Sequence, residues 1–287
     1  MKICYWGTAA AEGIPGVYCK CAVCQEAREK GERFVRTRSQ VLFDDSLMLD
    51  FGADTYMHAL KYGYNLGDLE NVIISHVHSD HFYPIELCFR AKAYSKDVGA
   101  PTLTVHGSPD VKEAFGKISD GVNGGVSRVE KEGRVVFNVL EPYKTYKIGE
   151  HEVTPMPAVH GTKNPYVYAI GKDGKNVLML NDTGLLKPEV IEFLKNQAVK
   201  FDLVSYDCTY GAGDTEKDWG AGAHHMGLVN ILQLRDLLIN IGICKDTTLH
   251  VLTHFSHNGP DAGYADMRKH ACKHGFILAY DGYFITL

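Results

Sequence analysis

The chain has 287 residues, of which 45% are hydrophobic and 23% charged, and its formal net charge is −5. This length allows one large domain or two small ones, and the composition is that of an ordinary soluble globular protein. The acidic balance leaves no basic stripe, which argues against a nucleic-acid partner, and no stretch is long and apolar enough to span a membrane.

The amino end, Met1 to Gly7, enters a strand pattern at once. It lacks the charged, apolar and small-residue regions of a signal peptide. We therefore expect a cytoplasmic protein whose eight cysteines stay mostly reduced. There is no internal repeat, low-complexity segment or Pro/Ser-rich linker, so we expect a single domain over residues 1–287.

Lys2 to Trp6 is predicted as the first strand, and a loop of small residues leads from it to Cys19, Cys21 and Cys24. Three cysteines within six residues of a reduced chain indicate metal more than disulfides. Thiolates at this spacing can surround one tetrahedral zinc and lack only a fourth ligand. A redox site and three unrelated thiols are the alternatives.

Ser39 to Phe43 and Ser46 to Asp50 are predicted as a hairpin, because the turn-forming pair Asp44-Asp45 separates them. Asp50 stands at the end of the second strand. On local pattern alone, it is explained by capping a helix that starts at about Asp54.

The most informative stretch follows the short, β-branched run Val72 to Ile74, which predicts a buried strand. His76 and His78 are two residues apart, so an extended backbone places both rings on one face. Asp80 and His81 follow where the chain turns, so their side chains can point to a second position in space beside the first. Two nitrogen ligands, followed by a carboxylate and another nitrogen, suit two adjacent divalent ions.

The middle of the chain is predicted as a strand, a helix, a loop and a run of strands, over Thr102 to His106, Pro109 to Ile118, Gly121 to Gly125 and Val135 to Met156. We expect His106, which is isolated, to be structural. His160 follows the last of these strands and precedes Gly161, the arrangement expected of a ligand delivered at a sheet edge. Alone it would be an ordinary histidine, but beside the central motif we expect a ligand.

The next hairpin is marked by Asp173-Gly174, and its second strand delivers Asp182. A helix (Pro188 to Lys195), a strand (Leu203 to Tyr206) and a glycine-rich loop (Gly211 to Gly222) are then predicted. Such a loop can move over a pocket. His224 and His225 stand at the start of a helix marked by leucines and isoleucines at helical spacing, and periodicity does not separate the two.

Near the end, Thr247 to Thr253 is predicted as a strand that delivers His254 and His257. Asp261 to Lys273 is predicted as the last helix. Phe276 to Tyr280 and Tyr283 to Thr286 are predicted to close the chain as a hairpin around Asp281-Gly282, a strong turn pair.

The spacing His76-x-His78-x-Asp80-His81 resembles the signature of the metallo-β-lactamase superfamily. The resemblance implies an α/β fold, the metallo-β-lactamase αββα sandwich of two mixed β-sheets flanked by helices. It also implies a ligand set for two ions: His76, His78 and His160 for one, Asp80, His81 and His254 for the other, and Asp182 between them. Asp50 would then orient a metal-binding histidine, which competes with the capping role.

The cysteine region narrows the resemblance. Gly7-Thr8, Glu12-Gly13-Ile14-Pro15 and the three cysteines are together similar to the PhnP-type cyclic-phosphate phosphodiesterases. That family implies His257, three residues past His254, as the fourth ligand of a structural zinc; an ordinary loop histidine is the alternative. It also implies a histidine outside the metal ligands that touches the scissile phosphate. His225 is the best match and His224 the fallback.

The resemblance implies a metal-dependent phosphodiesterase, which hydrolyses a small phosphate diester (a cyclic ribosyl phosphate included) with a hydroxide formed at the dinuclear metal site. The expected cofactors are two Zn²⁺ or Mn²⁺ ions in the active site and one structural Zn²⁺. The sequence does not fix the catalytic metal, because the same donors also accept iron or nickel. Asp80 would orient the water as well as bind metal, and a protonated His225 would stabilise the phosphoryl oxygens or the leaving group.

Other functions share parts of this pattern. They are a tRNA 3′-processing nuclease, a lactamase or lactonase, and a non-catalytic binder similar to PqqB. We expect a small-molecule partner and neither a membrane nor a nucleic acid; the oligomeric state is open, a homodimer included.

Overall fold

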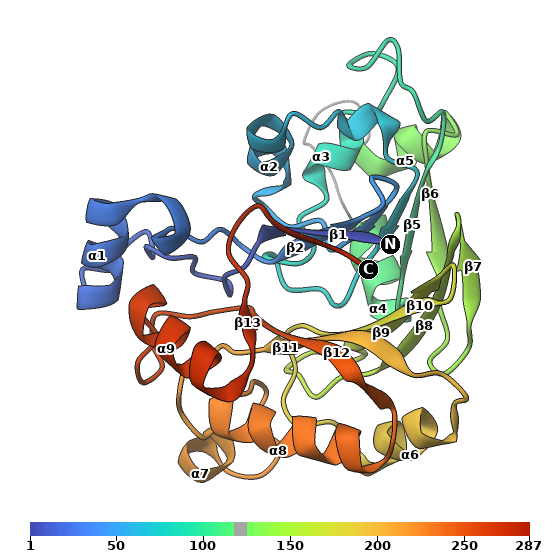
Figure 1. The fold of residues 1–287 in the computed structure, drawn as a ribbon. Coiled ribbons are helices and arrows are strands. Elements are labelled where there is room, and N and C mark those ends of the chain that lie inside the picture. Colours follow the sequence, from blue (N-terminus) through green and yellow to red (C-terminus); the bar gives the residue numbers. More distant parts are fainter. Residues whose placement is uncertain (118–124) are drawn as a thin grey trace.

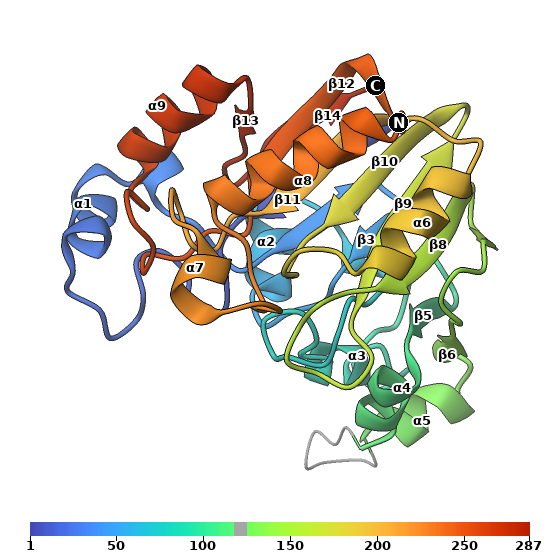
Figure 2. The same ribbon diagram turned by 90° about the horizontal axis from the view of Figure 1, so that it is seen from below.

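Two β-sheets of seven strands each pack face to face, and helices cover the outer side of each sheet (Figures 1 and 2). This arrangement is seen in a computed structural model that describes residues 1–117 and 125–287. The predicted αββα sandwich of two mixed sheets is confirmed.

The first sheet is antiparallel on one side and parallel on the other. Its strands, in spatial order, are β14 (Tyr283–Thr286), β1 (Lys2–Gly7), β2 (Gln40–Phe43), β3 (Leu47–Leu49), β4 (Asn71–Ile73), β5 (Leu103–Gly107) and β6 (Val135–Val139).

The second sheet has the same mixed character, with β10, β11, β12 and β13 parallel to one another. Its strands, in spatial order, are β13 (Ile277–Leu278), β12 (Cys244–Thr253), β11 (Phe201–Asp207), β10 (Lys175–Leu180), β9 (Tyr166–Lys172), β8 (His151–Pro157) and β7 (Tyr146–Ile148).

The helices lie in three places (Figure 1). The first sheet is covered by α2 (Thr55–Tyr62), α3 (Ile85–Cys88), α4 (Pro109–Gly116) and α5 (Gly125–Lys131). The second sheet is covered by α6 (Pro188–Asn196), α8 (Leu228–Asn240) and α9 (Tyr264–His274). The short α7 (Thr215–Trp219) lies beside α8, and α1 (Ala22–Lys30) protrudes from one side. Two 3₁₀ turns, η1 (Glu32–Phe34) and η2 (Leu66–Asp68), complete the elements. Within the described ranges, no helix has the length and apolar character needed to cross a bilayer.

The sandwich is held together by strands that are apolar on both faces. In β2, Val41 and Phe43 point into the core between the sheets, whereas Leu42 packs under the helices of the first sheet. In β10, Val177 faces the first sheet and Leu178 faces the helices of the second. Alternate side chains of a strand point to opposite faces, so such runs bury both sides. The central strands are therefore rigid supports for the segments beyond their ends.

The predicted C-terminal hairpin is wrong. β13 pairs in parallel with β12, and β14 pairs antiparallel with β1, so the chain crosses from one sheet to the other at Asp281-Gly282. Asp281 accepts hydrogen bonds from Thr8 Oγ1 at 2.8 Å and from the Thr37 N–H at 2.7 Å, which anchors the turn against the first sheet. An Asp-Gly pair signals a turn but does not say which strands it joins.

Three other expectations need revision. The predicted loop Gly121 to Gly125 has its first four residues outside the described ranges, and Gly125 begins α5. Ile118, the expected end of α4, also lies outside them, and α4 ends at Gly116. The predicted glycine-rich loop contains α7, capped by Asp214, which accepts a hydrogen bond from the Lys217 N–H at 3.3 Å. Helices this short show too few turns for periodicity to detect.

Candidate metal centre

A cavity of about 390 Å³ at one end of the sandwich is lined by five of the predicted ligands, His78, Asp80, His160, Asp182 and His254. The other two, His76 and His81, are buried against them. The segment after β4 carries His76, His78, Asp80 and His81, and the loop after β8 carries His160. Asp182 and His254 follow the ends of β10 and β12. Strand ends from both sheets therefore contribute to one site.

The first group of donors is His76, His78, His160 and Asp182, whose ligand atoms all lie within 4.8 Å of one another. His78 Nδ1 is 3.0 Å from both His76 Nε2 and His160 Nε2. The Asp182 carboxylate lies 3.3 Å from His76 Nε2. Three imidazoles and a carboxylate turned toward one point are a donor set for a divalent ion.

The second group is Asp80, His81, Asp182 and His254, which are all buried. His81 Nε2 lies 3.0 Å from Asp80 Oδ2, 3.0 Å from Asp182 Oδ2 and 3.3 Å from His254 Nε2. Asp182 belongs to both groups, the position expected of a carboxylate that bridges two ions.

Hydrogen-bond partners set the direction of the buried rings. His81 Nδ1 donates to Asp50 Oδ2 at 2.6 Å, so its Nε2 faces the second group. In the same way, Thr209 Oγ1 accepts from His254 Nδ1 at 2.8 Å, so that His254 Nε2 also faces the second group. Partners of this kind fix the tautomer that leaves the other nitrogen free to bind metal. Asp50 therefore orients His81 in this structure, while Asp54 occupies the N-cap of α2.

Three of these residues adopt an uncommon backbone conformation. Asp50, Asp182 and His254 have φ values of 68°, 55° and 57°, in the left-handed region. A non-glycine residue pays about 1–2 kcal/mol there. Each lies one or two residues beyond the end of a strand, where a sharp turn aims its side chain at the site, and such strain is typical of functional positions.

The charges favour metal-binding forms at the carboxylates. Burial opposes ionisation of Asp182, but the surrounding histidines hold its pKa well below the usual range. For Asp80, burial is likewise outweighed by His81, and its pKa is lowered. Burial lowers the pKa of His160 to about 4, so this ring is neutral at pH 7. Burial also opposes a charge on His81, but Asp50 and Asp80 raise its pKa well above the usual value.

The bridging carboxylate shows how well the residues fit a metal. Asp182 Oδ1 is buried and accepts no hydrogen bond from the residues that the structure describes. Yet His160 Nδ1 lies 3.1 Å from it and His225 Nδ1 3.0 Å. A buried carboxylate oxygen that accepts no hydrogen bond is costly, and a cation between these donors would satisfy it. The donor set thus fits divalent ions.

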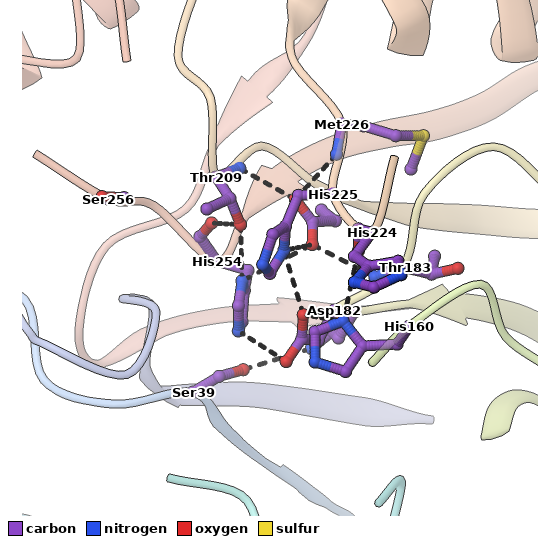
Figure 3. A network of polar contacts seen from close by, with 12 residues as sticks. Ser39, His160, Asp182, Thr183, Thr209, His224, His225, Met226, His254 and Ser256 are labelled. Carbon is purple, nitrogen blue, oxygen red and sulfur yellow. Dashed lines mark hydrogen bonds and ion pairs between the residues drawn. The ribbon is translucent and has the colours of Figure 1, made fainter. Parts of the chain in front are cut away.

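His225, and not His224, enters this site (Figure 3). Its Nδ1 lies between Asp182 Oδ1 at 3.0 Å and Asp207 Oδ2 at 3.1 Å. Burial opposes a charge on the ring, but Asp207 and Asp182 raise the pKa of His225 to about 11. His224 contributes its backbone carbonyl, 3.2 Å from His160 Nδ1. Since Nδ1 of His225 faces carboxylates, only its Nε2 can face a substrate.

Asp207 is a site residue that the sequence analysis passed over. It is fully buried at the end of β11 and accepts hydrogen bonds from the backbone N–H of Thr183 at 3.1 Å and of Thr209 at 2.8 Å. It therefore holds His225, Thr183, which follows Asp182 in the chain, and Thr209, which hydrogen-bonds to His254. An acidic residue that follows a buried strand is also the pattern of Asp50 and Asp182, and that pattern was the available signal.

The cysteines form a separate group with His257. The ligand atoms of Cys19, Cys21, Cys24 and His257 lie within 4.8 Å of one another. His257 Nδ1 is 3.8 Å from Cys19 Sγ and 3.7 Å from Cys21 Sγ. The backbone N–H of Cys21 lowers the pKa of the Cys19 thiol, whereas burial raises that of Cys24 to about 12. The structure brings together all four predicted ligands, and three sulfurs with one nitrogen fit a tetrahedral zinc.

Comparison with known proteins agrees with this architecture. No curated protein matches the sequence. Zn²⁺-bound PqqB from Methylobacterium extorquens superimposes with a TM-score of 0.73 at 17% identity, over 100% of both chains. A diphosphatase from the PhnP family has a TM-score of 0.70 at 18% identity, over 99% of this chain and 97% of that one.

A third structure, the metallo-β-lactamase fold protein YhfI from Bacillus subtilis, has a TM-score of 0.68 at 20% identity, over 99% of both chains. At such identities the likeness shows the fold, which is the metallo-β-lactamase fold. In sequence, residues 39–234, more than half of the chain, match the family described as "Anti-Pycsar protein Apyc1". The chain with these converging histidines and aspartates therefore belongs to the family of anti-Pycsar protein Apyc1.

Proposed function

We propose that the protein is a metal-dependent phosphodiesterase that hydrolyses a small phosphate diester. The observation that carries the proposal is the carboxylate of Asp182, which is shared by the two donor groups described above and lies 3.0 Å from His225 Nδ1, with which it forms a third group together with Asp207 and His254. Two adjacent cation sites with a histidine beside them suit the transfer of a charged phosphoryl group.

One ion would be held by His76, His78, His160 and Asp182, and the other by Asp80, His81, His254 and Asp182. Two Zn²⁺ or Mn²⁺ ions at these residues would offset the charge of the diester and acidify a water molecule. Asp80, which lines the cavity, would orient that water. His225 is held by two carboxylates, Asp207 and Asp182, which favour its protonated form. It would stabilise the phosphoryl oxygens or donate a proton to the leaving group.

The cavity favours a small substrate. Its volume of about 390 Å³ lies near the lower end for small-molecule pockets. The net charge of −5 disfavours a long polyanion such as tRNA. A cyclic ribosyl phosphate has a suitable size, and a PhnP-family diphosphatase shares the fold. Since the chain belongs to the family of an anti-Pycsar protein, we also propose that the reaction serves an anti-Pycsar role.

The alternatives are less well supported. A non-catalytic binder similar to PqqB would not need all seven donors to converge, as they do here. A lactamase or lactonase acts on an uncharged carbonyl group and has no evident use for a protonated His225 held by Asp207 and Asp182.

The test is a comparison of substrates on one preparation. Purified protein, stripped of metal and reloaded with Mn²⁺ or Zn²⁺, is assayed with bis-p-nitrophenyl phosphate, p-nitrophenyl phosphate, nitrocefin and a lactone. We expect cleavage of the diester with little activity on the other three. Rapid turnover of nitrocefin without diester cleavage would contradict the proposal.

A further inference from the structure

Glu12 lies between the two candidate metal sites. Its carboxylate lines the cavity, and Glu12 Oε1 is also 3.9 Å from His257 Nε2 in the cysteine group. The residue lies in the loop between β1 and α1, and only part of its side chain is exposed. None of the roles described above uses it.

On the side of the cysteines, Glu12 faces the back of the His257 ring. His257 Nδ1 points to the sulfurs of Cys19 and Cys21, and Nε2 points to Glu12. A metal-binding histidine usually has its second nitrogen near a carboxylate, a carbonyl or a water, which fixes the ring. Glu12 lies on that side of His257 at 3.9 Å, an ion-pair separation that is longer than a hydrogen bond.

On the side of the cavity, the same oxygen of Glu12 accepts two hydrogen bonds. One comes from Ser256 Oγ and the other from Asn258 Nδ2 at 3.1 Å. Ser256 and Asn258 both line the cavity, and His257 stands between them in the chain. Neighbouring side chains in this segment thus alternate between the two sites, and one carboxylate hydrogen-bonds to Ser256 and Asn258 and lies 3.9 Å from His257 Nε2.

The backbone reinforces this arrangement. The Phe255 N–H donates to the Thr8 carbonyl at 2.8 Å, and the Ala10 N–H donates to the Phe255 carbonyl at 2.9 Å. The segment that carries Glu12 therefore lies beside the segment that carries Ser256 and Asn258. The His257 ring and the cavity wall are therefore connected both through the Glu12 carboxylate and through a short backbone segment.

We propose that Glu12 is a positioning residue that links the cysteine group to the cavity. Metal at Cys19, Cys21, Cys24 and His257 fixes the His257 ring, and through Glu12 it fixes the wall formed by Ser256 and Asn258. Occupancy of the cysteine group then controls how tightly the substrate binds, and not the rate of the chemical step. As a statement about substrate binding, the inference rests on the proposed function.

The test compares Glu12→Gln, which keeps the size of the side chain, with Glu29→Gln, which removes the same charge from an exposed position on α1. Three quantities are measured: kcat and KM for bis-p-nitrophenyl phosphate, the affinity for inorganic phosphate, and the rate of zinc release to a chromogenic chelator. Cys21→Ser identifies which released zinc belongs to the cysteine group. Phosphate binding can be followed by tryptophan fluorescence, since Trp219 lines the cavity and the other tryptophan, Trp6, is buried.

We expect Glu12→Gln to raise KM and weaken phosphate binding about tenfold, with kcat within about twofold, as for loss of uniform binding. Zinc release from the cysteine group should become about tenfold faster. Glu29→Gln should match the unsubstituted protein in all three. Asn258→Ala, which removes only the donor on the cavity side, should weaken phosphate binding and leave zinc release unchanged.

A double substitution provides the decisive control. If the link is real, Glu12→Gln adds little to the rise in KM already caused by Cys21→Ser. The inference would be overturned if Glu12→Gln left zinc release or phosphate affinity unchanged. It would also be overturned if the increases in KM caused by Glu12→Gln and Cys21→Ser multiplied in the double variant. If the unsubstituted protein cleaves no diester, the proposed function fails, but zinc release and phosphate affinity still decide the role of Glu12.

Discussion

The protein has two candidate metal centres that are built in different ways. The histidine–aspartate groups lie where strands of both sheets end, and oriented partners such as Asp50 and Thr209 hold their rings. The cysteine group lies at the edge of the fold, on a loop and the first turn of α1, and gains its last donor, His257, from near the other end of the chain.

The difference separates a site that can react from one that holds the chain and leaves no position open for a substrate. The first centre lines a cavity, and Asp80, His160 and His225 face the space where a substrate can enter. The second has three thiols and one imidazole, so a tetrahedral zinc would have all its positions filled by the protein. We therefore expect catalysis from the first and folding stability from the second, with Glu12 between them.

The sharpest way to break the comparison is to remove the shared carboxylate. Asp182→Ala should lower diesterase kcat/KM by about 10³-fold, because both donor groups lose a charged ligand. Metal analysis should show loss of the ions bound by histidine and aspartate and retention of the zinc at the cysteines. Asp246→Asn, at an exposed position, is the matched control. Normal metal content in Asp182→Ala would mean that the carboxylate does not bridge two ions.

The reverse experiment targets the cysteines. Cys21→Ser should lower the free energy of unfolding by about 3 kcal/mol and Tm by roughly 6–10 °C, because a closed zinc site contributes directly to folding. One zinc should be lost, while folded protein keeps a normal kcat per pair of active-site ions. Cys272→Ser, an exposed cysteine on α9, should change neither quantity.

Thiol titration offers an independent check of the same prediction. In the native protein Cys19, Cys21 and Cys24 should react only after a strong chelator is added. Free reaction of all three thiols before chelation, with zinc analysis showing only the catalytic ions, would favour the redox alternative.

Within the first centre, substitution of His225 should show whether a residue acts in catalysis without binding metal. His225→Ala should lower kcat about 100-fold with much smaller loss of active-site metal, because the ring acts on the phosphate or leaving group. His224→Ala should have the smaller effect, since His224 reaches the site through its backbone carbonyl. An unchanged kcat in His225→Ala would remove this role from His225.

The smallest effect is expected from the residue behind His225. Asp207→Asn keeps an oxygen for only one of two backbone N–H groups, since Thr183 donates to Oδ2 and Thr209 to Oδ1, and it loses the charge beside His225 Nδ1. We expect a fall in kcat of about tenfold, with a melting temperature lower by about 2–4 °C. A large loss of stability together with normal kcat in the folded fraction would make Asp207 purely structural.

The local pattern of the sequence predicted most strands and the donors that come after them. The short apolar run Val72 to Ile74 is followed by four potential ligands. This combination can be recognised in a sequence, because a strand that ends at a sheet edge exposes the next few residues. The Asp173-Gly174 turn was equally local: φ values of 52° and 74° suit a tight hairpin. Short helices such as α7 were missed, since they have too little periodicity.

The sequence by itself determined which residue types stand at the ends of strands, while the αββα architecture and the two donor sets followed from its resemblance to the metallo-β-lactamase superfamily. Only the tertiary structure brought those donors together, showed that His225 rather than His224 faces Asp182, and showed that Asp207 and Glu12 connect separate segments. It also decided that β13 and β14 join different sheets. The physical reason is range: turns and alternation depend on neighbours in the chain, whereas convergence depends on how two sheets pack, and no local pattern records that.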